Sequence, residues 1–287
     1  MHVSGATTVC GIIGDPVEHS LSPVMQNAAF EAVGLDFVYV PLRVARGCAG
    51  MGAQAMRTLG LRGLNVTVPH KVDILPYLDW IDGQAGRIGA VNTIVNQDGR
   101  LLGYNTDAAG FMQGLAAQDV CVTGLDVVVM GAGGAARAVA FSLCEAGARL
   151  TLLNRDAGKA AALARDVSSV GGSRVASGEL TDASLETHLA GAALLVNTTS
   201  VGMHPHEALT PCPVRLLRRD LVVCDIVYNP RETQLLRDAA GRGAMTIAGV
   251  EMLVHQGARA FELWAGVPAP VGVMRAAVTK ELARVVH

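Results

Sequence analysis

The sequence predicts an α/β protein with two domains, and three observations lead to that prediction. Short apolar runs alternate with segments of helical period along the whole chain, as in proteins built from βαβ units. At 287 residues the chain is long for one hydrophobic core and comfortable for two. Aromatic residues make up only 4% of the chain, so Val, Leu, Ile and Ala must fill the cores, which suits buried parallel strands covered by helices.

The first half of the chain should form five strands and three helices. The strands are expected at residues 9–13, 37–42, 63–68, 90–96 and 101–104. The helices are expected at residues 23–33, 49–59 and 107–118. Ser22 should cap the first helix, because Pro23 follows it at the first helical position. Gln97-Asp98-Gly99 should form a hairpin turn between the last two strands.

The same alternation restarts more strongly after a predicted loop at residues 119–124. Strands are expected at residues 126–130, 149–153, 194–197, 222–226 and 244–247. Helices are expected at residues 134–146, 157–166, 232–240, 251–265 and 271–286. We therefore expect parallel sheets in both halves.

The predicted seam divides the chain into an N-terminal and a C-terminal domain separated by a cleft. The first domain should cover residues 1–107, with residues 250–287 packing back on it, and the second should cover residues 108–249. Such a cleft predicts opening and closing around bound ligands.

Charge and cysteine content exclude several classes of protein. A formal net charge of −2 without long runs of like charge excludes a nucleic-acid partner. No apolar stretch is long enough to span a membrane, and residues 1–8 do not resemble a signal peptide. None of the six cysteines forms a Cys-x-x-Cys pair, so reduced thiols and a cytoplasmic location are expected. Four cysteines stand in apolar surroundings and should be buried, namely Cys10, Cys121, Cys144 and Cys224.

Two histidines close in the sequence could be metal ligands. His204-Pro205-His206 has no third ligand at the spacing of a metal site, and we interpret it as a polar loop. We therefore expect no metal ion.

A glycine turn follows the first strand of the second half. Gly131-Ala132-Gly133-Gly134-Ala135-Ala136 fits the G-x-G-x-x-G/A pattern, with Ala136 in the last place. The glycines let main-chain N–H groups approach a pyrophosphate, and the following helix points its positive end at the phosphates. With an apolar strand before it and a helix after it, the turn indicates a Rossmann-type dinucleotide-binding domain rather than a mere strand-to-helix turn.

The residues after the second strand bear on which dinucleotide binds. An NAD site usually has an acidic residue about 20 positions after the first glycine. Here Asn154 and Arg155 begin 23 positions after Gly131, and Lys159 follows one helical turn later. A guanidinium can stack on adenine and bind a 2′-phosphate, so these residues favour NADP. Asp156 argues for NAD, because its carboxylate would repel that phosphate, unless it caps the next helix.

Polar residues gather at the predicted strand ends of the first half. They are Ser20, Ser22, Asn65, Thr67, Lys71, Asn92 and Asp107. The carboxyl ends of strands are where open α/β sheets bind ligands. Any one of these residues could instead cap a helix or satisfy a loop, but the ordered set indicates a ligand site.

Eight segments, in order and over nearly the whole chain, resemble a known family. They are His19-Ser20-Leu21-Ser22-Pro23, Asn65-Val66-Thr67-Val68-Pro69-His70-Lys71, Ala90-Val91-Asn92-Thr93, Gly103-Tyr104-Asn105-Thr106-Asp107, Gly131-Ala132-Gly133-Gly134-Ala135, Asn197-Thr198-Thr199-Ser200-Val201-Gly202-Met203, Asp225-Ile226-Val227-Tyr228 and Gly249-Val250-Glu251-Met252-Leu253-Val254-His255-Gln256. The set closely resembles the shikimate dehydrogenases, a family that includes quinate/shikimate dehydrogenases.

The resemblance implies an activity and a set of roles. The family reduces 3-dehydroshikimate to shikimate with NADPH, reversibly, in the biosynthesis of chorismate and the aromatic amino acids, with small molecules as partners. It implies that Lys71 is the general acid/base and that Asp107 lies beside it. The resemblance is also compatible with a homodimer.

Further roles are implied for substrate and cofactor residues. Contacts to the substrate are implied for Ser20, Ser22, Thr67, Lys71, Asn92, Asp107, Tyr228 and Gln256. Contacts to NADP are implied for Gly131, Ala132, Gly133, Gly134, Ala135, Asn154, Arg155, Lys159, Ile226 and Gly249.

The chemistry is consistent with the role of Lys71, and alternatives stay open. Hydride addition puts negative charge on the carbonyl oxygen, which an ammonium stabilises and can protonate. Lys71 could instead bind and polarise the substrate while another group gives the proton. The rivals are an NAD-dependent quinate/shikimate dehydrogenase and a non-catalytic dinucleotide-binding module. Ser22, in place of Thr, favours shikimate over quinate, and the presence of both Lys71 and Asp107 argues against a non-catalytic module.

Overall fold

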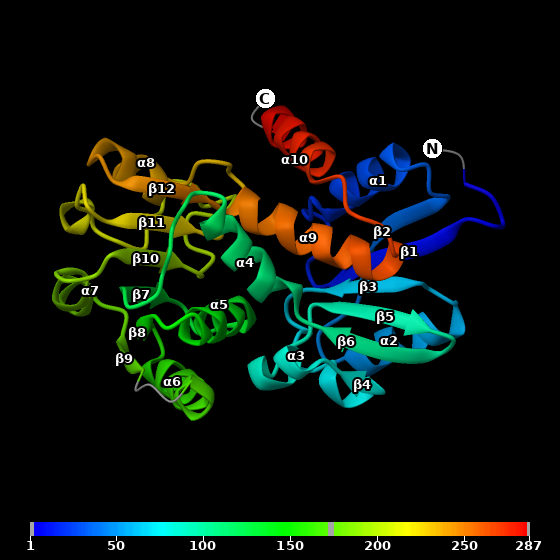
Figure 1. Cartoon of the computed structure of the whole chain (residues 1–287), viewed down its shortest axis with the longest axis horizontal. Coiled ribbons are helices and arrows are strands. Elements are labelled where there is room, and N and C mark those ends of the chain that lie inside the picture. The colour runs from blue at the N-terminus through cyan, green and yellow to red at the C-terminus, as the bar shows by residue number, and fades with distance from the viewer. Residues whose placement is uncertain (1–2, 172–174, 286–287) are drawn as a thin grey trace. The chain divides into compact units, whose positions relative to one another are not determined.

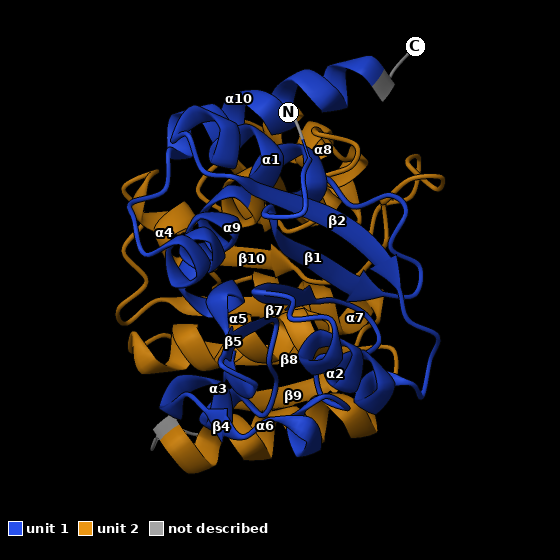
Figure 2. Ribbon diagram, turned by 90° about the vertical axis from the view of Figure 1, so that its right-hand side faces the viewer, with its two compact units in different colours: residues 1–110, 254–287 blue, residues 111–253 orange. Residues whose placement is uncertain are grey.

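The computed structural model describes residues 3–171 and 175–285, which form two compact units, each with one six-stranded sheet (Figure 1). Unit 1 comprises residues 1–110 and 254–287, and unit 2 comprises residues 111–253 (Figure 2). The chain passes from one unit to the other within two helices, α4 (Thr106–Ala116) and α9 (Gly249–Ala265). Across the described ranges, no helix is long and apolar enough to cross a membrane, and no three His, Cys, Asp or Glu residues are grouped to hold a metal ion.

Unit 1 contains a mixed sheet, so the prediction of a parallel sheet was wrong for this half. The strand order is β2-β1-β3-β5-β6-β4. The strands are β1 (Thr8–Gly14), β2 (Phe37–Arg43), β3 (Gly63–Val66), β4 (Trp80–Ile81), β5 (Thr93–Gln97) and β6 (Arg100–Tyr104). β1 runs parallel to β2 and β3, whereas β5 runs antiparallel to β3 and β6. The predicted hairpin turn joins β5 to β6, and both of its central residues, Asp98 (φ 53°) and Gly99 (φ 87°), take the left-handed conformation that a two-residue hairpin favours.

The helices of unit 1 include segments from both ends of the chain. They are α1 (Ser22–Ala32), α2 (Ala49–Thr58), the 3₁₀ turn η1 (Leu75–Tyr77), α3 (Gly83–Ile88), the C-terminal part of α9, and α10 (Val271–Val285), which packs against α1 (Figure 1). Trp264 fixes α9 to the sheet, because its Nε1 donates to the main-chain oxygen of Ile94 in β5 at 3.0 Å. A β carbon on Gly63 would lie 2.1 Å from that nitrogen, so only glycine leaves room for the indole ring.

Unit 2 has the all-parallel sheet that the sequence predicts, with strand order β12-β11-β10-β7-β8-β9. The strands are β7 (Asp126–Met130), β8 (Arg149–Asn154), β9 (Ala176–Glu179), β10 (Leu194–Asn197), β11 (Val222–Asp225) and β12 (Met245–Ala248). The helices are α5 (Gly134–Glu145), α6 (Ala157–Gly171), α7 (Asp182–Leu189), the 3₁₀ turn η2 (Val214–Leu216) and α8 (Gln234–Gly241). Counted from β7, this is the Rossmann order, and the direction of winding reverses between β7 and β10, where such sheets bind ligands.

The elements that the sequence analysis missed are short or exposed. They are α3, α7, β4, β9 and the 3₁₀ turns η1 and η2. Helix α7 buries only Leu185 and Leu189, a single i, i+4 pair that is too short a pattern to identify a helix, and no residue of β9 is buried. Helix α6 continues to Gly171, five residues past its predicted end. The last predicted helical residue, at position 286, lies outside the described residues.

Ser22 is not the cap of α1, contrary to prediction. The cap position belongs to Leu21, which provides no side-chain hydrogen bond, and Ser22 is the first residue of the helix. The N–H of buried Ser22 is satisfied instead by Oγ of half-buried Ser20, at 3.2 Å. The two serines predicted to bind the substrate are therefore adjacent at the start of α1.

The prediction of which cysteines are buried was wrong for one of the four. Cys121 is exposed, whereas Cys212 is fully buried. The four buried thiols are thus Cys10, Cys144, Cys212 and Cys224, and all six cysteines are free.

Candidate active site

Four of the predicted site residues meet at one edge of the unit 1 sheet. β3 ends just before Thr67, and β5 runs in the opposite direction, so Asn92, just before β5, reaches the same edge. β6 ends at this edge too, and α4 then begins with Asp107 in its first turn. Lys71 is held beside them, because the N–H of Val91 donates to its main-chain oxygen at 2.8 Å.

Lys71 and Asp107 form an ion pair. Nζ of Lys71 lies 2.5 Å from Oδ2 of Asp107, and the two side chains are only 15% and 8% exposed. Oδ1 of Asp107 accepts from Nδ2 of Asn92 at 2.8 Å. Asp107 is not needed as a helix cap, because Oδ1 of Asn105 accepts from the N–H groups of Asp107 and Ala108. Its carboxylate is therefore free to receive one donor on each oxygen.

The orientation of the Asn92 amide follows from its main-chain partner. The N–H of Thr106 can only donate, and it lies 2.7 Å from Oδ1 of Asn92. The oxygen of Asn92 therefore faces Thr106, and its nitrogen must face Asp107.

Close main-chain approaches position Thr67 and one further predicted substrate residue of unit 1, Gln256. A β carbon on Gly14 would lie 2.4 Å from Cγ2 of half-buried Thr67, so Gly14 lets Thr67 sit against β1. A β carbon on Gly110 would lie 2.6 Å from the main-chain nitrogen of Gln256, so α4 and α9 cross in close contact at this level. Gln256 itself is buried, with 9% of its surface exposed.

The glycine turn of unit 2 has the geometry of an anion site. Gly131 has φ of 116°, and a β carbon there would lie 2.4 Å from Oγ1 of Thr198. Gly133 occupies the cap position of α5, offers no side-chain cap, and would place a β carbon in open space. Because the first N–H groups of a helix have no partner within it, this turn can present them and the positive end of α5 to a pyrophosphate.

The residues predicted to bind the 2′-phosphate lie at the start of α6. Arg155 and Lys159 are both exposed. Oδ1 of Asp156 accepts from the N–H of Lys159 at 3.1 Å, and Nδ2 of Asn154 donates to the main-chain oxygen of Asp156 at 3.0 Å. Asp156 is therefore the N-terminal cap of α6, one of the two roles that the sequence left open.

Ile226, Tyr228 and Gly249 lie around the loop after β11. The N–H of Ile226 donates to the main-chain oxygen of Asn197 at 3.0 Å. A β carbon on Gly249 would lie 2.4 Å from the main-chain oxygen of Ile226, so the end of β12 and this loop approach closely only because residue 249 is glycine. Tyr228 follows two residues after Ile226 and is half-buried.

A buried carboxylate supports these loops and was not recognised from the sequence. Asp225 is fully buried and accepts from Nδ2 of Asn197 at 2.9 Å, the N–H of Val227 at 3.0 Å and Oγ1 of Thr233 at 2.7 Å. Burial raises the pKa of Asp225 to about 6. Asn197 and Asp225 both stand in motifs noted above, and the polar end of a buried strand was the signal that could have identified them.

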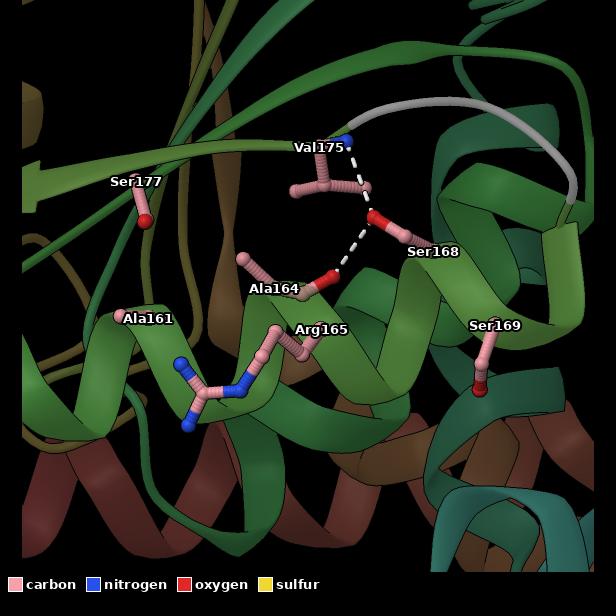
Figure 3. A pocket seen from close by; sticks show the side chains of 7 residues that line it. All are labelled: Ala161, Ala164, Arg165, Ser168, Ser169, Val175 and Ser177. Atoms are coloured by element: carbon pink, nitrogen blue, oxygen red, sulfur yellow. Dashed lines mark hydrogen bonds between the residues drawn. The ribbon is translucent and has the colours of Figure 1, made fainter.

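A shallow hollow between α6 and β9 is not the candidate site. Its volume is about 500 Å³, and it is lined by Ala161, Ala164, Arg165, Ser168, Ser169, Val175 and Ser177 (Figure 3). The hydroxyl of Ser168 donates to the main-chain oxygen of Ala164 and accepts from the N–H of Val175, as the dashed lines show. None of the predicted site residues is in this lining.

Two family models match the chain. The model described as shikimate dehydrogenase substrate binding domain matches residues 12–94, and the model described as shikimate 5′-dehydrogenase C-terminal domain matches residues 249–279. The curated shikimate dehydrogenase (NADP(+)) of Carboxydothermus hydrogenoformans is 46% identical over 280 residues, which cover 97% of this chain and 99% of that protein.

Solved structures agree with this result. A shikimate dehydrogenase crystallised in complex with NADP⁺ has a TM-score of 0.92 and 41% identity, over 98% of both chains. The shikimate 5-dehydrogenase of Thermus thermophilus, crystallised with NADP(H) and shikimate, has a TM-score of 0.86 and 37% identity, over 96% of this chain and 99% of that one. With such identity over nearly its whole length, and with the resemblance of its eight motifs confirmed, this chain belongs to the shikimate dehydrogenase family.

Proposed function

We propose that this protein is an NADP-dependent shikimate dehydrogenase, which reduces 3-dehydroshikimate to shikimate, reversibly, in the biosynthesis of chorismate and the aromatic amino acids. The curated relatives named for this activity support the proposal. The observation that carries it is the ion pair of Lys71 and Asp107 beside Asn92, because reduction of a ketone needs a positioned proton donor.

Lys71 is the proton donor in the proposed mechanism. NADPH, when bound, supplies the hydride. As the carbonyl oxygen gains negative charge, the ammonium of Lys71 stabilises it and gives it a proton, which leaves a neutral amine and a hydroxyl. In the reverse direction the neutral amine takes that proton back. Asp107 holds Nζ in place through Oδ2.

The other proposed substrate residues each recognise one part of a small polyhydroxylated acid. Ser20 and Ser22, adjacent at the start of α1, bind the carboxylate. Hydroxyl groups of the ring are bound by Thr67, Asn92, Asp107 and Gln256. Tyr228 of unit 2 is a further proposed substrate residue.

The proposed cofactor residues all belong to unit 2 or its boundary. The turn from Gly131 to Ala135 and the start of α5 hold the pyrophosphate, and the open space above Gly133 supports this fit. Asn154, Arg155 and Lys159 hold the adenosine 2′-phosphate, while Ile226 and Gly249 contact the nicotinamide end. Unit 1 is thus the substrate-binding domain and unit 2 the NADP-binding domain.

The experiment that tests the function is an absorbance assay of nicotinamide reduction with shikimate and quinate, each with NADP⁺ and NAD⁺. We expect the highest kcat/KM for shikimate with NADP⁺. A higher kcat/KM for quinate with NAD⁺ would favour the rival dehydrogenase. NADPH binding without turnover of any substrate would favour the non-catalytic module. A cytoplasmic location and a homodimer remain predictions, which fractionation and sedimentation equilibrium test.

A further inference from the structure

Thr93, the first residue of β5, is a fully buried hydroxyl that connects two buried amides of unit 1. Nδ2 of Asn65 donates to Oγ1 of Thr93 at 3.0 Å, and Oγ1 of Thr93 donates to Oδ1 of Asn92 at 3.0 Å. The antiparallel register pairs Asn65 directly with Thr93, so their side chains share one face of the sheet. The roles proposed above for substrate and cofactor use neither Asn65 nor Thr93.

Main-chain groups, which can only accept or only donate, fix the orientation of both amides in this cluster. Nδ2 of Asn65 donates to the main-chain oxygen of Asn92 at 3.1 Å, which fixes the Asn65 amide. Oδ1 of Asn65 therefore accepts from the hydroxyl of Tyr39, at 2.6 Å. The hydroxyl of Thr93 lies 3.0 Å from Oδ1 of Asn92 and 3.2 Å from Oγ1 of Thr106, and it donates its single proton to the nearer acceptor, Oδ1 of Asn92.

The same logic continues to the ion pair. Oδ1 of Asn92 receives the N–H of Thr106, so Nδ2 of Asn92 donates to Asp107. From Tyr39 through Asn65, Thr93 and Asn92, every hydrogen bond points toward the carboxylate of Asp107. Hydrogen bonds aligned in one direction polarise and strengthen one another in a buried site.

We propose that Thr93, supported by Asn65 and Tyr39, is a positioning residue for the reaction and acts through Asn92. It holds the Asn92 amide so that one N–H reaches Oδ1 of Asp107 while Lys71 occupies Oδ2. Thr93 does not touch the reacting atoms. The inference rests on the proposed function, because that function gives Lys71, Asn92 and Asp107 their roles.

The first test is Thr93→Val, which removes the hydroxyl and keeps the shape of the side chain. The Asn65 and Asn92 amides each keep a main-chain partner, so the fold should survive. We expect kcat for shikimate oxidation to fall about tenfold, since small misplacements of catalytic groups cost such factors. The KM for NADP⁺ and the affinity for NADPH should stay unchanged, because the proposed cofactor residues are not part of this cluster.

Two further variants separate positioning from mere stability. Thr93→Ser restores the hydroxyl and should bring kcat back to within about twofold of the unmodified enzyme. Ser142→Ala removes another buried hydroxyl, one that bonds only a main-chain oxygen within α5, and should leave kcat unchanged. A loss of kcat in Ser142→Ala equal to that in Thr93→Val would overturn the proposal.

A double-mutant cycle with Asn92→Ala tests whether Thr93 acts through Asn92. In the Asn92→Ala background, Thr93→Val should change kcat by less than about twofold, because no side-chain amide remains to be held. The proposal is overturned if Thr93→Val keeps full kcat, or if it lowers kcat by the same factor in both backgrounds.

A variant at another residue of the cluster keeps the inference testable if Thr93→Val does not fold. Tyr39→Phe removes the outermost donor of the chain of hydrogen bonds and should lower kcat about threefold, with the same dependence on Asn92. An unchanged kcat in Tyr39→Phe would then overturn the inference alone. An unmodified protein without shikimate turnover would overturn the proposed function, and this inference with it.

Discussion

Lys71 and Asp107 form a direct ion pair in unit 1, with 2.5 Å between Nζ and Oδ2, although 36 positions separate them in the sequence. Because both side chains are mostly buried, removal of either one leaves a charge without its partner. Substitution of either residue therefore affects both catalysis and stability, and the test of Lys71 measures the two effects separately.

Lys71→Ala should lower kcat for shikimate oxidation by about 10² to 10⁴, the usual loss when a general acid/base is removed. NADPH affinity, measured by fluorescence titration, should change little, because the predicted cofactor residues lie on unit 2. The thermal unfolding midpoint of the variant shows whether it is folded at the assay temperature. Turnover that stays near the unmodified level would contradict the role of Lys71.

Arg155→Ala should weaken NADPH binding by about tenfold or more, the scale of a lost charge-assisted hydrogen bond, and should weaken NADH binding much less. Arg165→Ala provides a matched control, because Arg165 is an exposed arginine on α6 farther along the same helix. Titration calorimetry with both cofactors measures the difference. Equal losses for NADPH and NADH would remove the phosphate role from Arg155.

Asp156→Ser should lower the KM for NADP⁺ about two- to fivefold, since it removes a carboxylate beside the predicted 2′-phosphate site while serine still caps α6. Asp156→Ala removes the carboxylate and the cap together, and should also destabilise the protein by about 1 kcal/mol. Initial rates and urea unfolding separate the two effects. A KM for NADP⁺ that is the same in all three proteins would show that the cap keeps this carboxylate away from the cofactor.

Asp225→Asn should change how stability depends on pH. Folding raises the pKa of Asp225 from 3.8 to about 6, because the carboxyl is buried. Between these values the folded protein holds a proton that the unfolded chain releases, so the free energy of unfolding falls as pH rises, by up to about 1.4 kcal/mol per pH unit. The asparagine variant lacks this contribution and should therefore become more stable relative to the unmodified protein as pH rises through this range.

Urea unfolding at several pH values between about 4 and 7 measures this difference for Asp225→Asn. Asp220→Asn is the control, because Asp220 is exposed and its pKa is lowered by the hydrogen bond to Arg218. A constant difference between Asp225→Asn and the unmodified protein across this range would contradict the raised pKa of Asp225.

Native thiol labelling should modify Cys121 first. Hydrogen bonding with the main chain of Thr123, and then with its side chain, lowers the pKa of the exposed Cys121 thiol. Burial raises the pKa of Cys10 and of Cys212 to about 12, so these thiols should react only after unfolding. Cys121→Ser should remove the fast phase of labelling by a disulfide reagent. A fast phase that persists in this variant would place the reactive thiol elsewhere.

The features that the sequence predicted well are those set by a few consecutive residues. The apolar run at residues 126–130 and the glycines after it identified β7, the turn and α5, because a buried strand and a sharp turn each need a local pattern. The polar residues at strand ends likewise indicated a ligand site. Exposed elements such as β9 escaped detection, because they carry no such pattern.

The sequence by itself determined the fold class, the dinucleotide-binding turn and the residue types available for chemistry. Tertiary structure decided that β5 runs antiparallel to β3, which aligns Thr93 with Asn65 and brings Asn92 to the edge where Asp107 lies in the first turn of α4. It also decided that Asp225 is buried among three donors. The physical reason is that strand direction and side-chain orientation depend on partners that lie tens of residues away, whereas hydrophobic period, turns and caps act within a few residues.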